Sequence, residues 1–349
     1  MAEYISFQPS DFYNTKLFTG TGASNALTGI GFQPDFAWIK NRDAADFHVL
    51  TDAVRGVTKY LQSNDAAAEV TNAESLKTFD SDGFTVGTMN EVNTNTEDYV
   101  SWNWKMGTTT GIDTTSSTIT PSGYSFNATA GQSVIAYTGN GVAGAKVPHG
   151  LGAVPQFFSI HRVDSTSAWD VFHHQQHTTT PAGYYLDWTS TAAAAVNSSR
   201  FNDTAPDAVN FTIGDSGYVN ENTGTYIAYC WTPKKGYSKF GGYRGNGNAD
   251  GPFIYTGFRP GFIMIKRIDS TGAWQVWDSK RPTYNETTGR LYPNDVDAES
   301  NTQELDILSN GFKYRDTGAA ANASSATYIY MAFAAFPTVS SNDIPGVAR

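Results

Sequence analysis

Cysteine and charge are scarce in this sequence, and each scarcity excludes a class of protein. A single cysteine, Cys230, leaves no partner for an internal disulfide in the 349 residues. The 23 basic residues are scattered and are outnumbered by 33 acidic ones. Because a phosphate backbone is bound by clustered Lys and Arg, nucleic acid is not an expected partner. No apolar run is long enough to predict a signal peptide or a membrane insertion.

Sequence motifs of familiar catalytic and cofactor sites are also missing. We find no nucleophile elbow, phosphate loop, paired-histidine metalloprotease helix or cysteine cluster for zinc. The sequence therefore predicts a protein that is not an enzyme, with no catalytic residues, no metal and no cofactor. It leaves the ligand-binding residues unknown.

The residues that are abundant favour strands and turns. Aromatic residues make up 14% of the chain, and 33 glycines punctuate it together with many Thr, Ser and Asn. Aromatic residues prefer strands, and glycine and asparagine prefer turns. The expected fold class is all-β.

One succession of short motifs occurs three times. Each copy opens with an aromatic residue and a glycine turn, written "FTGTG", "YTGNG" and "YRGNG". It continues through a strand such as "GFIMIK" and ends on an alternating aromatic strand, written "YVSWNWK", "YIAYCWT" and "YIYMAFA". The copies span 81 to 89 residues, which suits a complete small sandwich better than a solenoid repeat or a propeller blade. We expect three tandem antiparallel β-sandwich domains.

The repeat predicts where the domains begin and end. The predicted order is an N-terminal docking segment, repeat 1, a Thr/Ser-rich linker, repeat 2, a second linker, repeat 3 and a C-terminal tail. Their ranges are 1–15, 16–106, 107–132, 133–232, 233–242, 243–337 and 338–349.

Two strand patterns predict how each sheet is built. "DFAWIK" and "GFIMIK" are continuously apolar, which favours a strand in the middle of a sheet and covered on both faces. The closing strand of repeat 1 instead alternates, with Trp102 and Trp104 on one face and Ser101 and Asn103 on the other. We expect one face of that strand to be buried.

Three groups of polar residues are candidates for chemistry, and each also has a structural interpretation that we favour. The histidines could bind a transition metal, but the other repeats carry ordinary polar residues there, which indicates surface variation. The closely spaced acids could hold calcium or act as a glycosidase pair, but they lie in turns without a calcium-loop pattern. A basic-acidic element recurs in every repeat and could capture a ligand, although an arginine paired with the nearby aspartate explains it as well. The residues are His173, His174 and His177; Asp80, Asp82, Asp295, Asp297 and Glu299; and Lys40, Arg42, Asp43, His161, Arg162, Asp164, Lys266, Arg267 and Asp269.

Aromatic side chains raise the same choice between a sugar platform and core packing. Trp169, Trp274 and Trp277 lie on predicted strands and are expected in the core. A sugar-binding site would more readily use aromatic residues at loop tips, such as Tyr184, Trp188 or Tyr284.

Longer phrases of the sequence resemble a known family. The runs "GFQPDFAWIKNRD", "FDSDGFTVGT", "IAYTGNGVAGAKVPHGLGAVPQ" and "GYSKFGGYRGNGNADGPFIYTGFRPGFIMIKR" are similar to repeated-domain virion structural proteins, of tail fibre or appendage type, of marine tailed bacteriophages. The resemblance spans nearly the whole chain and implies a concanavalin-like or jelly-roll-like, lectin-like sandwich. It brings no catalytic residues with it.

The resemblance and the composition together give three functional hypotheses. The first is a bacteriophage virion structural protein, exposed as a tail fibre, appendage or decoration subunit, that contributes to host attachment. The second is a virion-associated polysaccharide depolymerase, and the third is a capsid or tail adaptor without a receptor role. The expected partners are other virion proteins and a host-surface glycan, with the chain as a homo-oligomer such as a trimer. The expected location is the virion, assembled in the host cytoplasm, where a chain without disulfides stays reduced.

Overall fold

The fold is described by a computed structural model that covers residues 8–282, 284–302 and 305–335. Strands β1 to β25 account for nearly all regular structure, and they form antiparallel sheets. The helices are single turns: η1 (Pro9–Asp11), η2 (Pro181–Gly183), α1 (Asn90–Asn93), α2 (Ser198–Phe201), α3 (Gly217–Asn220) and α4 (Ala319–Asn322). The predicted all-β class is confirmed.

Each repeat contributes one main sheet, and the three sheets share one strand order. In every repeat the closing strand lies between the opening strand and the continuously apolar strand, and a fourth strand pairs with the other side of the apolar strand. In repeat 1 the order is β1 (Tyr13–Thr19), β9 (Asp98–Trp104), β3 (Phe36–Asn41) and β4 (Val49–Asp52). In repeat 3 it is β19 (Ser238–Arg244), β25 (Thr327–Ala334), β21 (Pro260–Arg267) and β22 (Gln275–Asp278). The predicted mid-sheet place of β3 and β21 is confirmed.

The main sheet of repeat 2 is larger because extra strands flank the shared four. The shared strands are β11 (Gln132–Thr138), β18 (Thr225–Trp231), β13 (Phe157–Arg162) and β14 (Asp170–His173). β10 (Gly123–Asn127) pairs with the outer side of β11, and β15 (Tyr184–Asp187) and β16 (Ala195–Val196) extend the other edge.

Smaller antiparallel sheets accompany the main ones. They are β2 (Asn25–Thr28), β8 (Gly83–Val86) and β7 (Leu76–Asp80); β12 (Ala145–Pro148) and β17 (Asn210–Ile213); β20 (Phe253–Tyr255), β24 (Gly311–Tyr314) and β23 (Leu305–Leu308); and β5 (Lys59–Tyr60) with β6 (Val70–Thr71).

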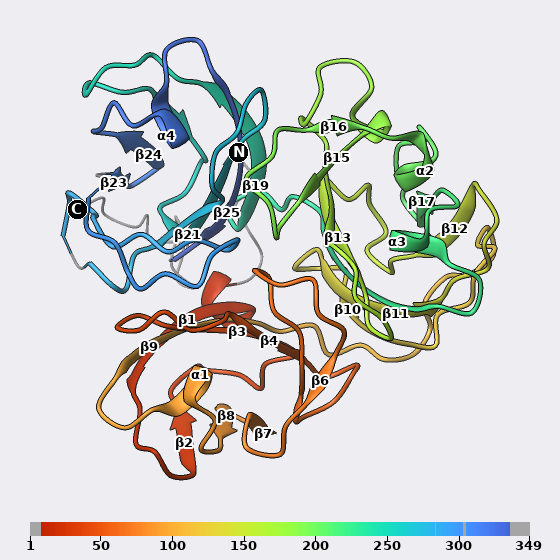
Figure 1. Ribbon diagram of the computed structural model, residues 1–349, viewed down its shortest axis with the longest axis horizontal. Coiled ribbons are helices and arrows are strands. Elements are labelled where there is room, and N and C mark those ends of the chain that lie inside the picture. The colour runs from red at the N-terminus through yellow and green to blue at the C-terminus, as the bar shows by residue number, and fades with distance from the viewer. Residues whose placement is uncertain (1–7, 283, 303–304, 336–349) are drawn as a thin grey trace.

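Three lobes lie around a common centre, one for each repeat (Figure 1). Each repeat has its own hydrophobic cluster, and a fourth cluster at the centre takes residues from all three. At its middle, the rings of Trp104, Trp231 and Phe333 are in mutual contact, with centroids 5.6 to 6.4 Å apart. These three residues occupy one equivalent position on the closing strands, so the repeats meet around an approximate threefold axis.

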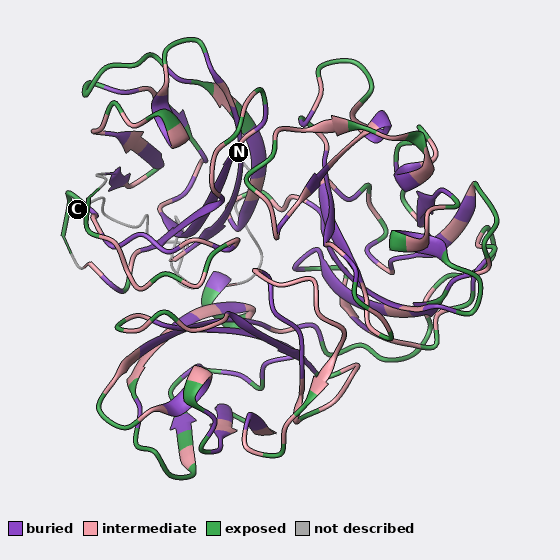
Figure 2. Cartoon of the chain, viewed as in Figure 1, coloured by how far each residue is buried: buried purple, intermediate pink, exposed green. Residues whose placement is uncertain are grey.

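The expectation that the closing strands bury only one face is wrong. Ser101 and Asn103 are as fully buried as Trp102 and Trp104. One face of β9 packs on the central cluster, while its other face looks toward the cluster of its own repeat. Figure 2 shows the inner strands of the main sheets as mostly buried ribbons, with exposed residues concentrated in the loops.

A buried asparagine holds the glycine turn at the start of each repeat. In repeat 2, Asn220 accepts a 2.8 Å hydrogen bond from Asn140 N and donates one of 2.8 Å to the Gly214 carbonyl. A Cβ at Gly139 would lie 2.3 Å from the Glu221 carbonyl oxygen, so only glycine fits beside this clamp. Asn93 and Asn322 occupy the same place in the other repeats.

Candidate functional site

The repeats are joined head to tail by equivalent hydrogen bonds. At each junction a ring N–H of one repeat donates to a backbone carbonyl of the repeat before it. The pairs are Trp169 Nε1 with Gln62 O at 2.8 Å, Trp274 Nε1 with Asp187 O at 2.8 Å, and His48 Nε2 with Tyr292 O at 2.9 Å. His48 acts as the donor because its Nδ1 accepts from Trp38. The last pair joins repeat 3 back to repeat 1 and closes a ring.

Buried ion pairs reinforce the closing junction. Arg281 contacts Asp278 at 2.7 Å, and both side chains are fully buried. Asp278 also accepts a 3.0 Å hydrogen bond from Trp102 Nε1 of repeat 1. Glu299 binds Arg281 at 2.9 Å and is held by both the Nε and Nη2 atoms of Arg42, again from repeat 1. At the junction between repeats 1 and 2, Asp52 binds Arg55 at 2.6 Å and the Tyr229 hydroxyl at 2.8 Å.

The recurring basic-acidic element is structural in two repeats and differs in the first. Arg162 binds Asp164 and Arg267 binds Asp269, each at 2.7 Å, as predicted. The prediction that Arg42 pairs with the adjacent Asp43 is wrong, because Arg42 forms its ion pair with Glu299 instead. The strand position held by Arg162 and Arg267 is Asn41 in repeat 1, so Arg42 projects from the next position along the chain.

The first residue of that element is buried at each junction. Lys40 donates to the carbonyl of its neighbour Asn41 at 2.7 Å, and burial lowers its pKa to about 8 although Asp46, Asp297 and Asp295 oppose the shift. Lys266 donates to carbonyls on both sides of its junction, and burial lowers its pKa to about 7. His161 stacks on Trp169 with centroids 4.4 Å apart, and burial lowers its pKa to about 4.

The three neighbouring histidines are directed to different partners. His173 Nε2 contacts the Tyr330 carbonyl at 3.2 Å, and His174 Nε2 contacts the Phe240 carbonyl at 3.2 Å. His177 stacks on Tyr184 with centroids 4.1 Å apart. The interpretation as surface variation is therefore wrong for His173 and His174, which pack at the junction between repeats 2 and 3. Among the described residues, no three His, Cys, Asp or Glu side chains gather where they could hold a metal ion.

The candidate acids lie in turns and at a junction. Asp82 accepts backbone hydrogen bonds from Gly29 and Gly31, which hold its pKa below the ordinary value, and Asp80 accepts from Thr85 at 2.8 Å. Asp295 accepts from the backbone of Val296. The negative charges of Asp295 and Asp297 raise the pKa of Lys40 across the closing junction, against the larger effect of burial.

The aromatic candidates divide by burial. Trp169, Trp274 and Trp277 are buried in the cores, as expected. Trp188 is completely buried against Trp169, so its predicted place at an exposed loop tip is wrong. Tyr284 is exposed over 80% of its surface.

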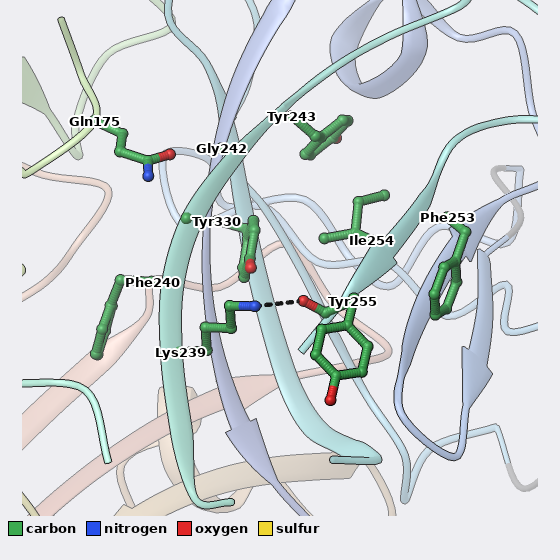
Figure 3. A pocket seen from close by; sticks show the side chains of 10 residues that line it. Gln175, Lys239, Phe240, Gly242, Tyr243, Phe253, Ile254, Tyr255 and Tyr330 are labelled. Atoms are coloured by element: carbon green, nitrogen blue, oxygen red, sulfur yellow. Dashed lines mark hydrogen bonds between the residues drawn. The ribbon is translucent and has the colours of Figure 1, made fainter. Parts of the chain in front are cut away.

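A groove of about 330 Å³ lies in repeat 3 between β19 and β20. It is lined by aromatic side chains of both strands and of β25 (Figure 3). Phe253 and Tyr255 are 46% and 58% exposed, which is unusual for rings of this size in this protein. Gly241 forms part of the floor and lies opposite Tyr330 across the β19–β25 ladder.

Polar groups line the same groove. Lys239 Nζ donates to the Tyr255 carbonyl at 2.7 Å and lies 5.0 Å from the Tyr255 ring centroid. Burial raises the pKa of Tyr330 to about 12, so its hydroxyl stays protonated. Gln175, from repeat 2, completes the lining. Rings, an ammonium group and a carboxamide together make a surface that can bind a polar chain with apolar faces.

The residues that line the groove differ from their counterparts in repeat 2, and the sequence did not reveal the groove. Position 241 is glycine where repeat 2 has Ile135, and the exposed positions of β20 hold Phe253 and Tyr255 where β12 has Lys146 and Pro148. The available signals were the "FGG" and "FIY" departures from the repeat, which become informative once the strands are aligned by register.

No helix among the described residues has the length and apolarity needed to cross a bilayer. A family model described as a domain of unknown function (DUF7483) matches residues 8–337. No curated protein matches the chain.

Proposed function

The chain belongs to the DUF7483 family, and we propose that it is a bacteriophage virion structural protein. In this proposal it is an exposed tail fibre, appendage or decoration subunit that contributes to attachment to the host surface. The proposal joins the resemblance of its repeated motifs to virion proteins with the closed ring that the three repeats form.

The closed ring is the observation that carries the proposal. Three equivalent junctions and one central aromatic cluster connect every repeat to both others. Each repeat contributes a main sheet and a smaller one, which supports the proposal of three tandem β-sandwich modules. Such a body gains stability from packing rather than disulfides, which suits a particle assembled in a reducing cytoplasm.

The ring also bears on oligomerisation. Each junction surface is already occupied by the neighbouring repeat within the same chain. In the proposed homo-oligomer, including a trimer, the subunits would therefore contact one another through other surfaces. The groove beside β19 is the surface we propose for a partner in the particle or on the host.

Particles of a phage that encodes this chain provide the test. Mass spectrometry of purified particles should find the protein at a fixed stoichiometry, and immunogold labelling should place it on an exposed appendage or on the head surface. Label buried between tail components would favour the adaptor. Release of reducing sugar ends from host glycans by the purified chain, lost in Asp295→Asn or Asp297→Asn, would favour the depolymerase. Absence of the protein from particles would refute the proposal.

A further inference from the structure

Repeat 2 covers its own sheet edges with a segment of the same chain. β10 pairs antiparallel with the outer side of β11, from Gly123 opposite Ala136 to Asn127 opposite Gln132. Just before β10, the backbone N–H groups of Thr118 and Ile119 both donate to the Lys146 carbonyl on β12 at 3.0 Å. One extended segment therefore closes the gap between the two sheets of repeat 2.

The equivalent edges of repeat 3 lack such a segment among the described residues. Tyr137 and Tyr243 hold the same place, because each lies opposite the first tyrosine of its closing strand. Gly242 therefore corresponds to Ala136, the residue that pairs with Gly123 of β10. The Gly245 N–H donates to the carbonyl of Ala326, the residue just before β25, at 2.9 Å. Alternation along the ladder therefore turns the N–H and C=O groups of Gly242 and Arg244 away from β25. β19 is the end strand of its sheet.

Two side chains partly cover this edge. His174 contacts the carbonyl of Phe240, and Lys239 donates to the carbonyl of Tyr255 on β20. A lysine at a strand edge is a common protection against unwanted pairing. The backbone N–H and C=O groups of Gly242 and Arg244 still point outward from the sheet, next to the groove.

The groove can hold a side chain of a strand that adds to this edge. In repeat 2, Tyr124 of β10 lies opposite Ile135 and packs against the core of that repeat. The position equivalent to Ile135 is Gly241, which lies in the lining of the groove, and the Tyr330 ring takes the space that a side chain at Gly241 would fill. A ring held as Tyr124 is held would therefore enter the groove against the Tyr330 ring, on the side of Tyr255 (Figure 3).

We propose that this groove binds an extended peptide of a partner protein, which adds as a strand to β19 in the way that β10 adds to β11. Main-chain hydrogen bonds to Gly242 and Arg244 would provide affinity, and the groove would select an aromatic residue that alternates with small polar residues. The segment Gly123–Asn127 shows that pattern, Gly-Tyr-Ser-Phe-Asn. That the partner is a virion protein rests on the proposed function, whereas the site itself can be tested on the isolated chain.

The probe is a synthetic peptide with the sequence of residues 117–128 of this chain, titrated against the full-length protein. We expect saturable binding, and we expect slower amide hydrogen exchange in the segment that contains Gly242 and Arg244. A peptide of the same length with proline at alternate positions is the control, because it cannot form a ladder.

A matched pair of variants separates strand pairing from simple pocket binding. Gly242→Ala introduces the residue that repeat 2 carries and should keep peptide binding. Gly242→Pro removes one outward donor and should weaken binding by about fivefold or more, the value of one hydrogen bond. Equal thermal unfolding midpoints for the two variants would show that the fold is kept. Lys239→Ser, which copies Ser133 of repeat 2, should strengthen binding because it uncovers the Tyr255 carbonyl.

Other outcomes overturn the inference. No saturable binding would do so, as would binding that Gly242→Pro and the exchange experiment leave unchanged. Binding of an oligosaccharide that Tyr255→Ala abolishes and Gly242→Pro does not affect would assign the groove to a glycan. Self-association abolished by Gly242→Pro would assign it to a second copy. Because these experiments need no virion, they can fail while the particle experiment succeeds, and the reverse.

Discussion

Replacement of Arg281 by methionine tests whether buried charge holds the ring closed. The Arg281 and Asp278 side chains are fully buried and 2.7 Å apart, and Arg281 also binds Glu299 at 2.9 Å. Methionine would leave the Asp278 carboxylate buried with hydrogen bonds but no cation. Removal of one partner from a buried pair costs about 3–5 kcal/mol, and we expect a loss of that size in the free energy of unfolding.

Arg162→Met is the matched control, because Arg162 binds Asp164 at the same 2.7 Å but with side chains 21% and 37% exposed. An exposed pair contributes about 0–1 kcal/mol. Urea unfolding, followed through the eight tryptophans, measures both losses. The double variant Asp278→Asn with Arg281→Met should recover part of the loss, since it buries no unpaired charge. Equal losses for the two single variants, or no recovery in the double variant, would refute this account of the closing junction.

Three further predictions concern buried polar groups. Asn220→Ala should cost about 2–3 kcal/mol because it leaves several turn groups unpaired, measurable as a lower urea midpoint than for an exposed Asn→Ala variant. Burial raises the pKa of the Cys230 thiol, so a thiol reagent such as Ellman's should react with it only after unfolding; fast reaction of the native protein would contradict the buried position. Burial lowers the pKa of Lys266 from 10.5 to about 7, so between these values the unfolded chain binds a proton that the folded chain lacks, and stability rises with pH. Lys266→Met should flatten that rise in urea titrations from pH 7 to 10.5, and an unchanged slope would show that Lys266 does not cause it.

The sequence predicted features that depend on local pattern. The all-β class, the mid-sheet place of β3 and β21, and the buried positions of Trp169, Trp274 and Trp277 all follow from apolar runs and strand-forming residues. A continuously apolar run predicts burial on both faces of a strand.

The features that were missed depend on contacts between repeats. Ser101 and Asn103 look solvent-facing because their polarity is typical of an exposed face, yet a second core covers them. Arg42 has an acid next to it in the sequence, but its partner Glu299 lies 257 residues away. His173 was misjudged for the same reason, because its partner carbonyl belongs to repeat 3. The groove beside β19 was missed because it arises where a covering strand is lacking, and no local motif records that.

The direction of the three junctions has a consequence for the ancestry and redesign of this protein. Every junction runs from one repeat to the next, and the last junction returns to the first repeat. The three repeats therefore hold equivalent positions in the ring, as the subunits of a cyclic trimer do before they are fused into one chain. Tyr13, near one described end of the chain, stacks on Phe333, near the other, with ring centroids 5.5 Å apart. A rearranged gene that links those ends and begins at the turn before β19 would encode the same three contacts in a new order.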